Sequence, residues 1–317
     1  MTRCFLLVMT LASTACMETG IRALHDESAG YDDPVLDTAD SEPDEQEEEV
    51  EEGGDEGHND VEDRPEDDLP PEEEEPAPED DCDHTSDLIY VIDRTDQSLY
   101  LFDPTDLQFD FVGELDCGIW AGTPGSMSVA RDGKAYVRYS DNTVYAVDLS
   151  TMACEETDYA QGSFGSFGMG FATNSSDTWR DQLYVANHDR LARIDTTSWS
   201  MDILGSLPSQ SELTGNADGE LWAILPLETP AKLVRLQTSD ASIVETLTVP
   251  SMPSAMDIDV FAFATWGGDF WVFIRTYGMG QSTNVYRVSE SGATSLVAEN
   301  TGMDVVGAGV STCAPTD

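Results

Sequence analysis

Beyond residue 84 the hydrophobic positions fall in short alternating runs separated by turn residues, a pattern typical of β-strands. One ten-residue unit recurs, in which an alternating strand runs into a turn rich in Asp, Ser, Thr or Gly. Its five copies begin at Leu99, Val144, Leu191, Leu233 and Val285, at intervals of 42 to 52 residues. Intervals of this size, with four short strands in each, predict a β-propeller in which every repeat forms one blade.

Tight-turn dipeptides predict further strands of the blades. Asp132-Gly133, Asp218-Gly219 and Gly267-Gly268 each separate two apolar runs, and such dipeptides favour hairpins because glycine adopts positive φ angles readily. The runs before these turns are predicted as inner strands, and the runs after them as second strands. The inner strands are residues 126–130, 213–217 and 260–264, and the second strands are residues 135–139, 221–225 and 270–274.

The first repeat lacks an inner strand, because residues 88–92 already occupy the place of a second strand. At the other end of the chain, residues 305–310 form an alternating run with no blade of its own. Pairing of these two runs would close the ring and remove both open edges. We therefore predict an all-β fold over residues 84–317, a five-bladed β-propeller closed by the C-terminal strand.

Residues 129–137 (VARDGKAYV) and 142–150 (NTVYAVDLS) resemble the repeats of NHL and streptogramin-lyase-like propellers. Those families alternate an Asp-Gly turn with a strand that ends in Asp and a Ser/Thr-rich turn. The resemblance spans residues 88–313, is clear in two or three blades, and implies the fold. No acid–base histidine pair of the lyases can be matched onto this domain, so the resemblance implies no activity.

The first residues have the features of an export signal. Arg3 supplies a positive start, residues 4–12 are apolar but too short to span a bilayer, and small residues up to Ala15 follow. We expect a signal peptide over residues 1–15 and a protein that acts outside the cytoplasm.

The residues before Cys16 resemble the lipobox of bacterial lipoproteins, although Ser13 stands where that pattern prefers Leu. The resemblance implies that Cys16 is lipidated and anchors the mature chain in a membrane. Met17, in place of the Asp that retains lipoproteins in the inner membrane, favours the outer membrane or cell surface. The alternative is ordinary cleavage after Ala15 and a periplasmic or secreted protein. The combination of a lipobox, a following acidic segment and a propeller also resembles uncharacterised envelope lipoproteins of Gram-negative bacteria.

The charge of the chain is concentrated in one segment. The formal net charge is −49, and residues 26–83 hold 30 acidic residues against one basic residue, with hardly an apolar side chain. Such a composition predicts disorder, so we expect residues 16–83 to be an acidic linker that holds the propeller away from the membrane. Divalent-cation binding by this linker is the alternative. The acidity also excludes nucleic acid and electrostatic attraction to anionic lipid, since both require clustered Lys and Arg.

Four cysteines remain after Cys4 in the signal and Cys16, and an even number in an exported domain predicts two disulfides. Ring closure brings Cys313 close to Cys82, which leaves Cys117 to pair with Cys154. In the predicted register this second pair lies on opposite faces unless residues 116–125 fold back. A metal site is not expected, because no CxxC pair is present and histidine is scarce.

No residue is predicted to be catalytic. His188 is the one histidine within the blades, and it belongs to a predicted turn. Residues 162–170 are rich in glycine but lack the lysine of a phosphate-binding loop and lead into a strand, so we expect close packing near the propeller axis. Trp120 and Trp266 fall in or beside loops and are the candidate binding residues, because an indole can stack on a sugar or anchor a partner.

Asp103, Asp148 and Asp195 recur at equivalent positions of successive blades. The expected role is capping of the turn through side-chain hydrogen bonds to backbone N–H groups, and calcium binding is the alternative. No other cofactor is expected.

These observations predict an exported lipoprotein whose propeller binds a ligand or partner, an envelope protein or a glycan, through the loops at one end of its channel. The first alternative is a propeller enzyme, a lyase or glycan-active hydrolase, with carboxylates in the channel. The second is a cation-binding envelope protein that acts through its linker.

Overall fold

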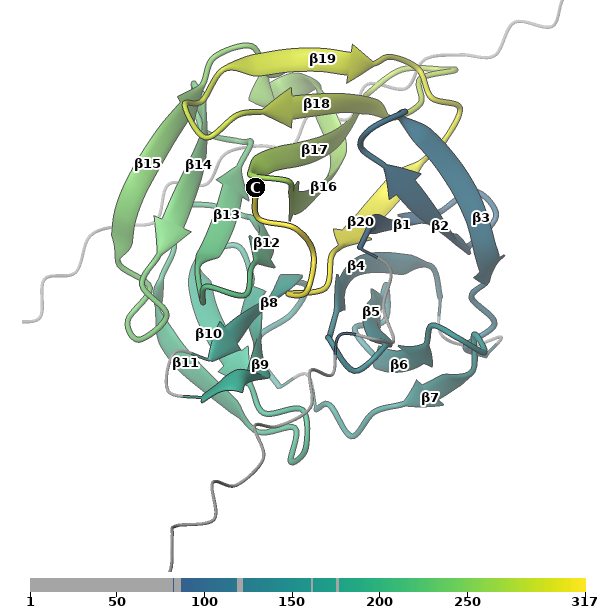
Figure 1. Cartoon of the computed structure of the whole chain (residues 1–317), viewed down its shortest axis with the longest axis vertical. Helices are drawn as coiled ribbons and strands as arrows, with labels where there is room; N and C mark the ends of the chain where they lie inside the picture. The colour runs from purple at the N-terminus through teal and green to yellow at the C-terminus, as the bar shows by residue number, and fades with distance from the viewer. Residues whose placement is uncertain (1–81, 83–86, 119–121, 161, 175–176) are drawn as a thin grey trace, which may run out of the picture. The chain divides into compact units, whose positions relative to one another are not determined.

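The computed structural model describes residues 82, 87–118, 122–160, 162–174 and 177–317, with only the backbone described for residues 177–179. All of them belong to one compact unit, Glu73–Asp317. They form five antiparallel sheets of four strands each, arranged as a ring around a central axis (Figure 1). No helix of these residues is long and apolar enough to cross a membrane.

The blades follow one another in chain order, from the inner strand at the axis to the outer strand at the rim. Blade 1 contains β20 (Val305–Gly309), β1 (Ile89–Asp93), β2 (Ser98–Asp103) and β3 (Gln108–Glu114). Blade 2 contains β4 (Pro124–Val129), β5 (Lys134–Tyr139), β6 (Val144–Asp148) and β7 (Cys154–Glu156). Blade 3 contains β8 (Gly168–Asn174), β9 (Asp177–Ala186), β10 (Arg190–Ile194) and β11 (Met201–Ser206). Blade 4 contains β12 (Glu212–Gly215), β13 (Leu221–Leu225), β14 (Ala231–Leu236) and β15 (Ile243–Val249). Blade 5 contains β16 (Ile258–Trp266), β17 (Asp269–Thr276), β18 (Asn284–Val288) and β19 (Thr294–Ala298).

The ring closes through the C-terminal strand, and the predicted five-bladed fold is confirmed. β20 pairs antiparallel with β1, with Tyr90 opposite Gly309 and Asp93 opposite Val305. Blade 1 is therefore assembled from both ends of the domain, and β1 is not left as an open edge strand.

The core is divided among the junctions between blades. Five clusters of buried apolar side chains each join two adjacent blades, and the largest buried members include Phe102, Met127, Met169, Leu191 and Phe273. Each blade therefore uses both faces of its sheet, which explains why its central strands are almost continuously apolar.

Neighbouring inner strands run parallel and approach closely at glycines. A Cβ atom at Gly170 of β8 would lie 2.8 Å from the carbonyl carbon of Leu213 on β12. Close packing at the axis, expected for the glycine-rich residues 162–170, is thus present at Gly170. We call the face where the inner strands begin the entrance face, and the face where they end the tail face.

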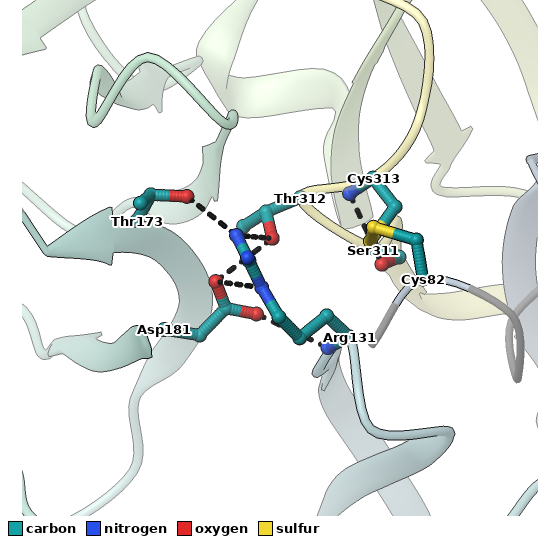
Figure 2. The surroundings of a disulfide bond; sticks show 7 residues. All are labelled: Cys82, Arg131, Thr173, Asp181, Ser311, Thr312 and Cys313. Carbon is teal, nitrogen blue, oxygen red and sulfur yellow. Dashed lines mark hydrogen bonds and ion pairs between the residues drawn. A yellow bond between two sulfur atoms is a disulfide. The ribbon is translucent and has the colours of Figure 1, made fainter. Parts of the chain in front are cut away.

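The C-terminal segment, residues 310–317, crosses the centre of the ring on the tail face (Figure 1). Thr312 is fixed there by two charged residues, as Figure 2 shows. Its hydroxyl donates to Asp181 at 2.8 Å and accepts from Arg131 at 3.0 Å, while Arg131 and Asp181 form a buried ion pair. The next residue, Cys313, is bonded to Cys82, with the two Cα atoms 5.7 Å apart. The tail therefore covers one end of the channel.

The second disulfide joins Cys117 to Cys154, with Cα atoms 5.0 Å apart. The chain turns inward after β3, so that Leu115 and Cys117 are buried in the apolar cluster between blades 1 and 2. This inward turn is the fold-back that the predicted register required, and it brings Cys117 to the start of β7.

Candidate functional site

A cavity of about 290 Å³ opens at the entrance face, where the inner strands begin. We call it the entrance cavity. Its size lies near the lower end of small-molecule sites, which span roughly 300–1,000 Å³. Residues from all five blades contribute to its lining, among them Ser126, Arg138, Ser166, Glu212, Asp259 and Val306.

Glu212, the first residue of β12, supplies a buried carboxyl group to this cavity. The Ser126 hydroxyl on β4 donates to Glu212 Oε2 at 2.6 Å and accepts a hydrogen bond from the amide of Met169 at 3.0 Å. Burial raises the pKa of the Glu212 carboxyl to about 7, and the hydrogen bond from Ser126 and the charge of Arg138 limit this rise. At neutral pH both protonation states of Glu212 are therefore populated.

Arg138, on β5, is held with its guanidinium group at the cavity wall. Its Nε donates to the carbonyl of Phe167 at 2.9 Å, and its Nη1 donates to the carbonyl of Tyr139 at 3.1 Å. A Cβ atom at Gly125 would lie 2.8 Å from Nη2, so the absence of a side chain there leaves room for the guanidinium group. Burial lowers the pKa of Arg138, while the nearby Glu212 carboxylate opposes this change. Within the described part of the chain, Arg138 has no acidic partner within ion-pair distance.

A chain of ion pairs lies at the rim of the cavity. Asp304 Oδ2 accepts from Arg94 at 2.8 Å and from Arg275 at 2.8 Å, and Arg275 also pairs with Asp259. Two cations and two anions thus neutralise one another. The remaining charged pair that faces the cavity is Arg138 and Glu212.

This arrangement supports two kinds of chemistry. The guanidinium group of Arg138 and the carboxyl group of Glu212, which is held by the Ser126 hydroxyl, can both form hydrogen bonds to a small polar ligand. A carboxyl group with a pKa near 7 is also suited to proton transfer at neutral pH. Across the residues that the structure describes, no group of three or more His, Cys, Asp or Glu is placed to hold a metal ion.

Of the two tryptophans predicted as binding residues, only Trp266 can be placed, and it does not line this cavity. Trp120 lies outside the described residues. Trp266, at the end of β16, is on the tail face, where its indole N–H donates to the carbonyl of Asp87 and its ring packs against the core between blades 5 and 1. Its observed contacts hold the start of the domain against blade 5.

The recurring aspartates form hydrogen bonds within their own turns. Asp103 accepts from the amide and hydroxyl of Thr105, and Asp195 accepts from the amides of Thr197 and Ser198. Asp148 accepts from the amides and hydroxyls of Ser150 and Thr151, and these hydroxyl groups lower its pKa to about 2. Turn capping therefore accounts for these contacts.

His188 lies in the turn between β9 and β10, and its side chain is 84% exposed. It contacts only Asp189, at 4.0 Å, among the residues whose contacts are described. This is the solvated turn position expected for it.

A second hollow, of about 420 Å³, lies on the tail face between blades 2 and 3. Two of its charged residues, Arg131 and Asp181, are already bonded to each other and to Thr312. Their hydrogen bonds hold the C-terminal tail, so these two side chains are not available to a ligand.

Ser126, Arg138 and Glu212 were not identified from the sequence. One indication was available for Glu212, which directly precedes the predicted inner strand 213–217 and is a charged residue at a position facing the axis. Arg138 lies within the predicted second strand 135–139, where a cation interrupts an apolar run.

Comparisons with known proteins add the following. No family model matches the chain, and no curated protein matches it. Among solved structures, a protein of unknown function from Bacteroides thetaiotaomicron is 14% identical, with a TM-score of 0.43 over 70% of this chain. The chain spans only 58% of that protein. A luciferin-regenerating enzyme is 11% identical, with a TM-score of 0.41 over 69% of this chain and 92% of its own. Likeness at this level carries no functional argument, and the resemblance to NHL and streptogramin-lyase-like repeats stays a prediction.

Proposed function

We propose that this protein is a ligand-binding module of the cell envelope, and that the entrance cavity of its propeller binds a small polar molecule. The observation that carries the proposal is the pairing of the buried Glu212–Ser126 hydrogen bond with the fixed guanidinium group of Arg138 at one cavity. Because the C-terminal tail covers the tail face, a ligand would enter and leave through the entrance face.

The proposed location rests on the chain's N-terminal features. These are the export signal over residues 1–15, the lipobox that ends at Cys16 and the acidic linker over residues 16–83, all of which lie outside the described residues apart from Cys82. The two disulfides fit a protein that folds in an oxidising compartment. We propose lipid anchoring through Cys16, with the propeller held away from the membrane.

The test is a thermal-shift screen of the full mature chain against small envelope constituents, namely monosaccharides, amino sugars, amino acids and short organic acids. A ligand that binds the folded state raises the melting temperature in a concentration-dependent way. We expect at least one of these classes to do so, and the rise to disappear in Arg138→Gln and Ser126→Ala. Arg193→Gln, which removes an exposed ion pair with Asp202 on blade 3, is the control. A ligand-induced rise that survives both cavity substitutions would contradict the proposed site, and the absence of any rise would contradict the proposed function.

The second candidate function is an enzyme, a lyase or glycan-active hydrolase, and one observation favours it. The pKa of Glu212, near 7, is the value that general acid–base catalysis at neutral pH requires. An enzyme would convert the molecule that the screen identifies, and Glu212→Gln would abolish turnover while leaving binding measurable. A binding module would leave the molecule chemically unchanged over hours of incubation.

A further inference from the structure

The entrance cavity gathers several basic side chains on an otherwise acidic domain. Residues 84–317 hold 32 acidic and 11 basic residues, yet Arg94, Arg138 and Arg275 gather at this one mouth. The rim ion pairs balance Arg94 and Arg275 against Asp304 and Asp259. The charge state of the cavity is therefore decided by Arg138 and Glu212 alone.

Arg138 is prepared for an anion. Two backbone carbonyls fix the plane of its guanidinium group, the Phe167 ring lies 5.7 Å from the guanidinium carbon, and Nη2 donates to none of the described residues. A guanidinium group held in this way loses little conformational entropy when it binds a planar carboxylate. The side-chain-free Gly125 beside Nη2 keeps the approach open.

Glu212 lines the same cavity as Arg138. The groups around it are the Ser126 hydroxyl from β4, the Met169 amide from β8 and Arg138 from β5, and the other charged residues that line the cavity are Asp259 and Arg94. When ionised, Glu212 neutralises Arg138 and repels an anionic ligand. When protonated, it leaves the charge of Arg138 free and can donate its own proton to a ligand oxygen.

We propose that the ligand of the entrance cavity is a small organic acid, whose carboxylate binds Arg138 while Glu212 takes up a proton. This inference rests on the proposed ligand-binding function and names its ligand class. The cavity volume of about 290 Å³ suits a molecule of the size of a sugar acid or a short hydroxy acid.

Proton uptake follows from linkage. The anion binds the form in which Glu212 is protonated, so its apparent affinity is constant well below the pKa of Glu212 and falls as pH rises through it. With that pKa at about 7, affinity falls about tenfold between pH 6 and pH 8. In Glu212→Gln the side chain cannot ionise, and this pH dependence disappears.

The test is isothermal titration calorimetry of the full mature chain with matched acid and neutral probes. The pairs are D-glucuronate with D-glucose and lactate with 1,2-propanediol, each titrated at pH 6, 7 and 8 in two buffers of different ionisation enthalpy. We expect the acid of at least one pair to bind tenfold or more tightly than its neutral partner. That binding should take up a fraction of a proton at pH 7, and Arg138→Gln should weaken it tenfold or more. Arg193→Gln should bind as the wild-type chain does.

The outcomes separate the two proposals. A neutral probe that binds as tightly as its acid, in a manner that Ser126→Ala weakens, overturns the organic-acid inference and leaves the ligand-binding function standing. Acid binding without proton uptake, or with the same pH dependence in Glu212→Gln, overturns the role of Glu212. Failure of both members of both pairs, at concentrations where the thermal-shift screen detects another class of ligand, overturns the inference but not the function.

Discussion

The Ser126 hydroxyl on β4 donates a hydrogen bond of 2.6 Å to the Glu212 carboxylate on β12, and thereby joins two blades that are not neighbours in the ring. The strand between them is β8, which offers no side chain at Gly168. A Cβ atom there would lie 2.8 Å from Glu212 Cδ and close to the Ser211 carbonyl oxygen. Gly168 therefore makes the Ser126–Glu212 hydrogen bond geometrically possible.

We predict that Gly168→Ala destabilises the propeller and displaces the Glu212 carboxyl group. Overpacking against backbone atoms costs about 1–3 kcal/mol, because neither inner strand can move freely. Chemical denaturation measures the loss. Gly302→Ala is the comparison, since no atom lies within 4 Å of its Cβ position and only its positive φ is unfavourable, at about 1 kcal/mol. Equal losses in the two variants would contradict the packing argument.

We predict that the stability of the wild-type protein falls with rising pH because of Glu212. The pKa of this carboxyl is higher in the folded than in the unfolded state, so the folded state binds the proton more tightly. The resulting stabilisation is complete below the unfolded value of about 4.5 and is lost as pH rises through about 7. The total is on the order of 3 kcal/mol.

The measurement is the free energy of unfolding of wild type and Glu212→Gln between pH 5 and pH 8. The difference between the two proteins isolates Glu212 from aspartates with lowered pKa values, such as Asp148, whose effects appear at lower pH. We expect the variant to gain stability relative to wild type as pH rises. A constant difference over this range would show that Glu212 is not protonated near neutrality in the folded protein.

The sequence predicted the fold well because each blade is locally encoded. The third strand of each blade begins within two residues of a copy of the ten-residue unit, from β2 at Ser98 to β18 at Asn284. Ring closure also followed from local information, since one repeat lacked a strand and the other end of the chain supplied a spare one.

The site was harder to predict, because it depends on contacts between blades. Glu212 is buried and hydrogen-bonded to Ser126, which is 86 residues away in sequence. The alternating pattern specifies which side chains point inward. It does not specify which inner strands lie close enough for their side chains to form a hydrogen bond. The inward turn at Leu115 and Cys117 was indicated only by the cysteine pairing and not by the strand pattern, because burial of that segment is decided by the neighbouring blade.

The C-terminal tail gives a third prediction, which concerns Thr312→Val. The substitution keeps the shape of the side chain but removes the hydroxyl that donates to Asp181 and accepts from Arg131. Removing one hydrogen-bonding partner from a buried ion pair lowers the free energy of unfolding by about 1–3 kcal/mol. Hydrogen exchange should become faster in residues 310–317, and Thr197→Val, at an exposed turn position, should have no such effect. Unchanged exchange in the tail would mean that the Cys82–Cys313 bond and the other tail contacts, such as the hydrogen bond from the Gly267 amide to the Pro315 carbonyl, hold it without the Thr312 hydroxyl.

The disulfides give a fourth prediction. Cys82 and Cys313 are 231 residues apart, and Cys117 and Cys154 are 37 residues apart. In the chain-entropy model the longer loop contributes about 5 kcal/mol and the shorter about 4 kcal/mol, as upper estimates. Paired Cys→Ser variants should therefore both lower the melting temperature, with the larger decrease for the first pair. Peptide mapping without reduction provides the direct measurement, and fragments that link Cys82 to Cys117 or Cys154 would contradict the pairing.

The last prediction concerns Cys16, in the part of the chain that the structure does not describe. If the lipobox is processed, the mature chain begins at Cys16 and carries acyl chains, each buried methylene of which contributes about 0.8 kcal/mol to membrane binding. Mass spectrometry of membrane-extracted protein should find lipid mass on the peptide that begins at Cys16. Cys16→Ser should move the protein into the soluble fraction, whereas Cys4→Ser, within the predicted signal peptide, should leave it in the membrane. An unlipidated mature N-terminus near Ala15 would contradict lipid anchoring. It would indicate a secreted or periplasmic protein whose propeller is not attached to a membrane.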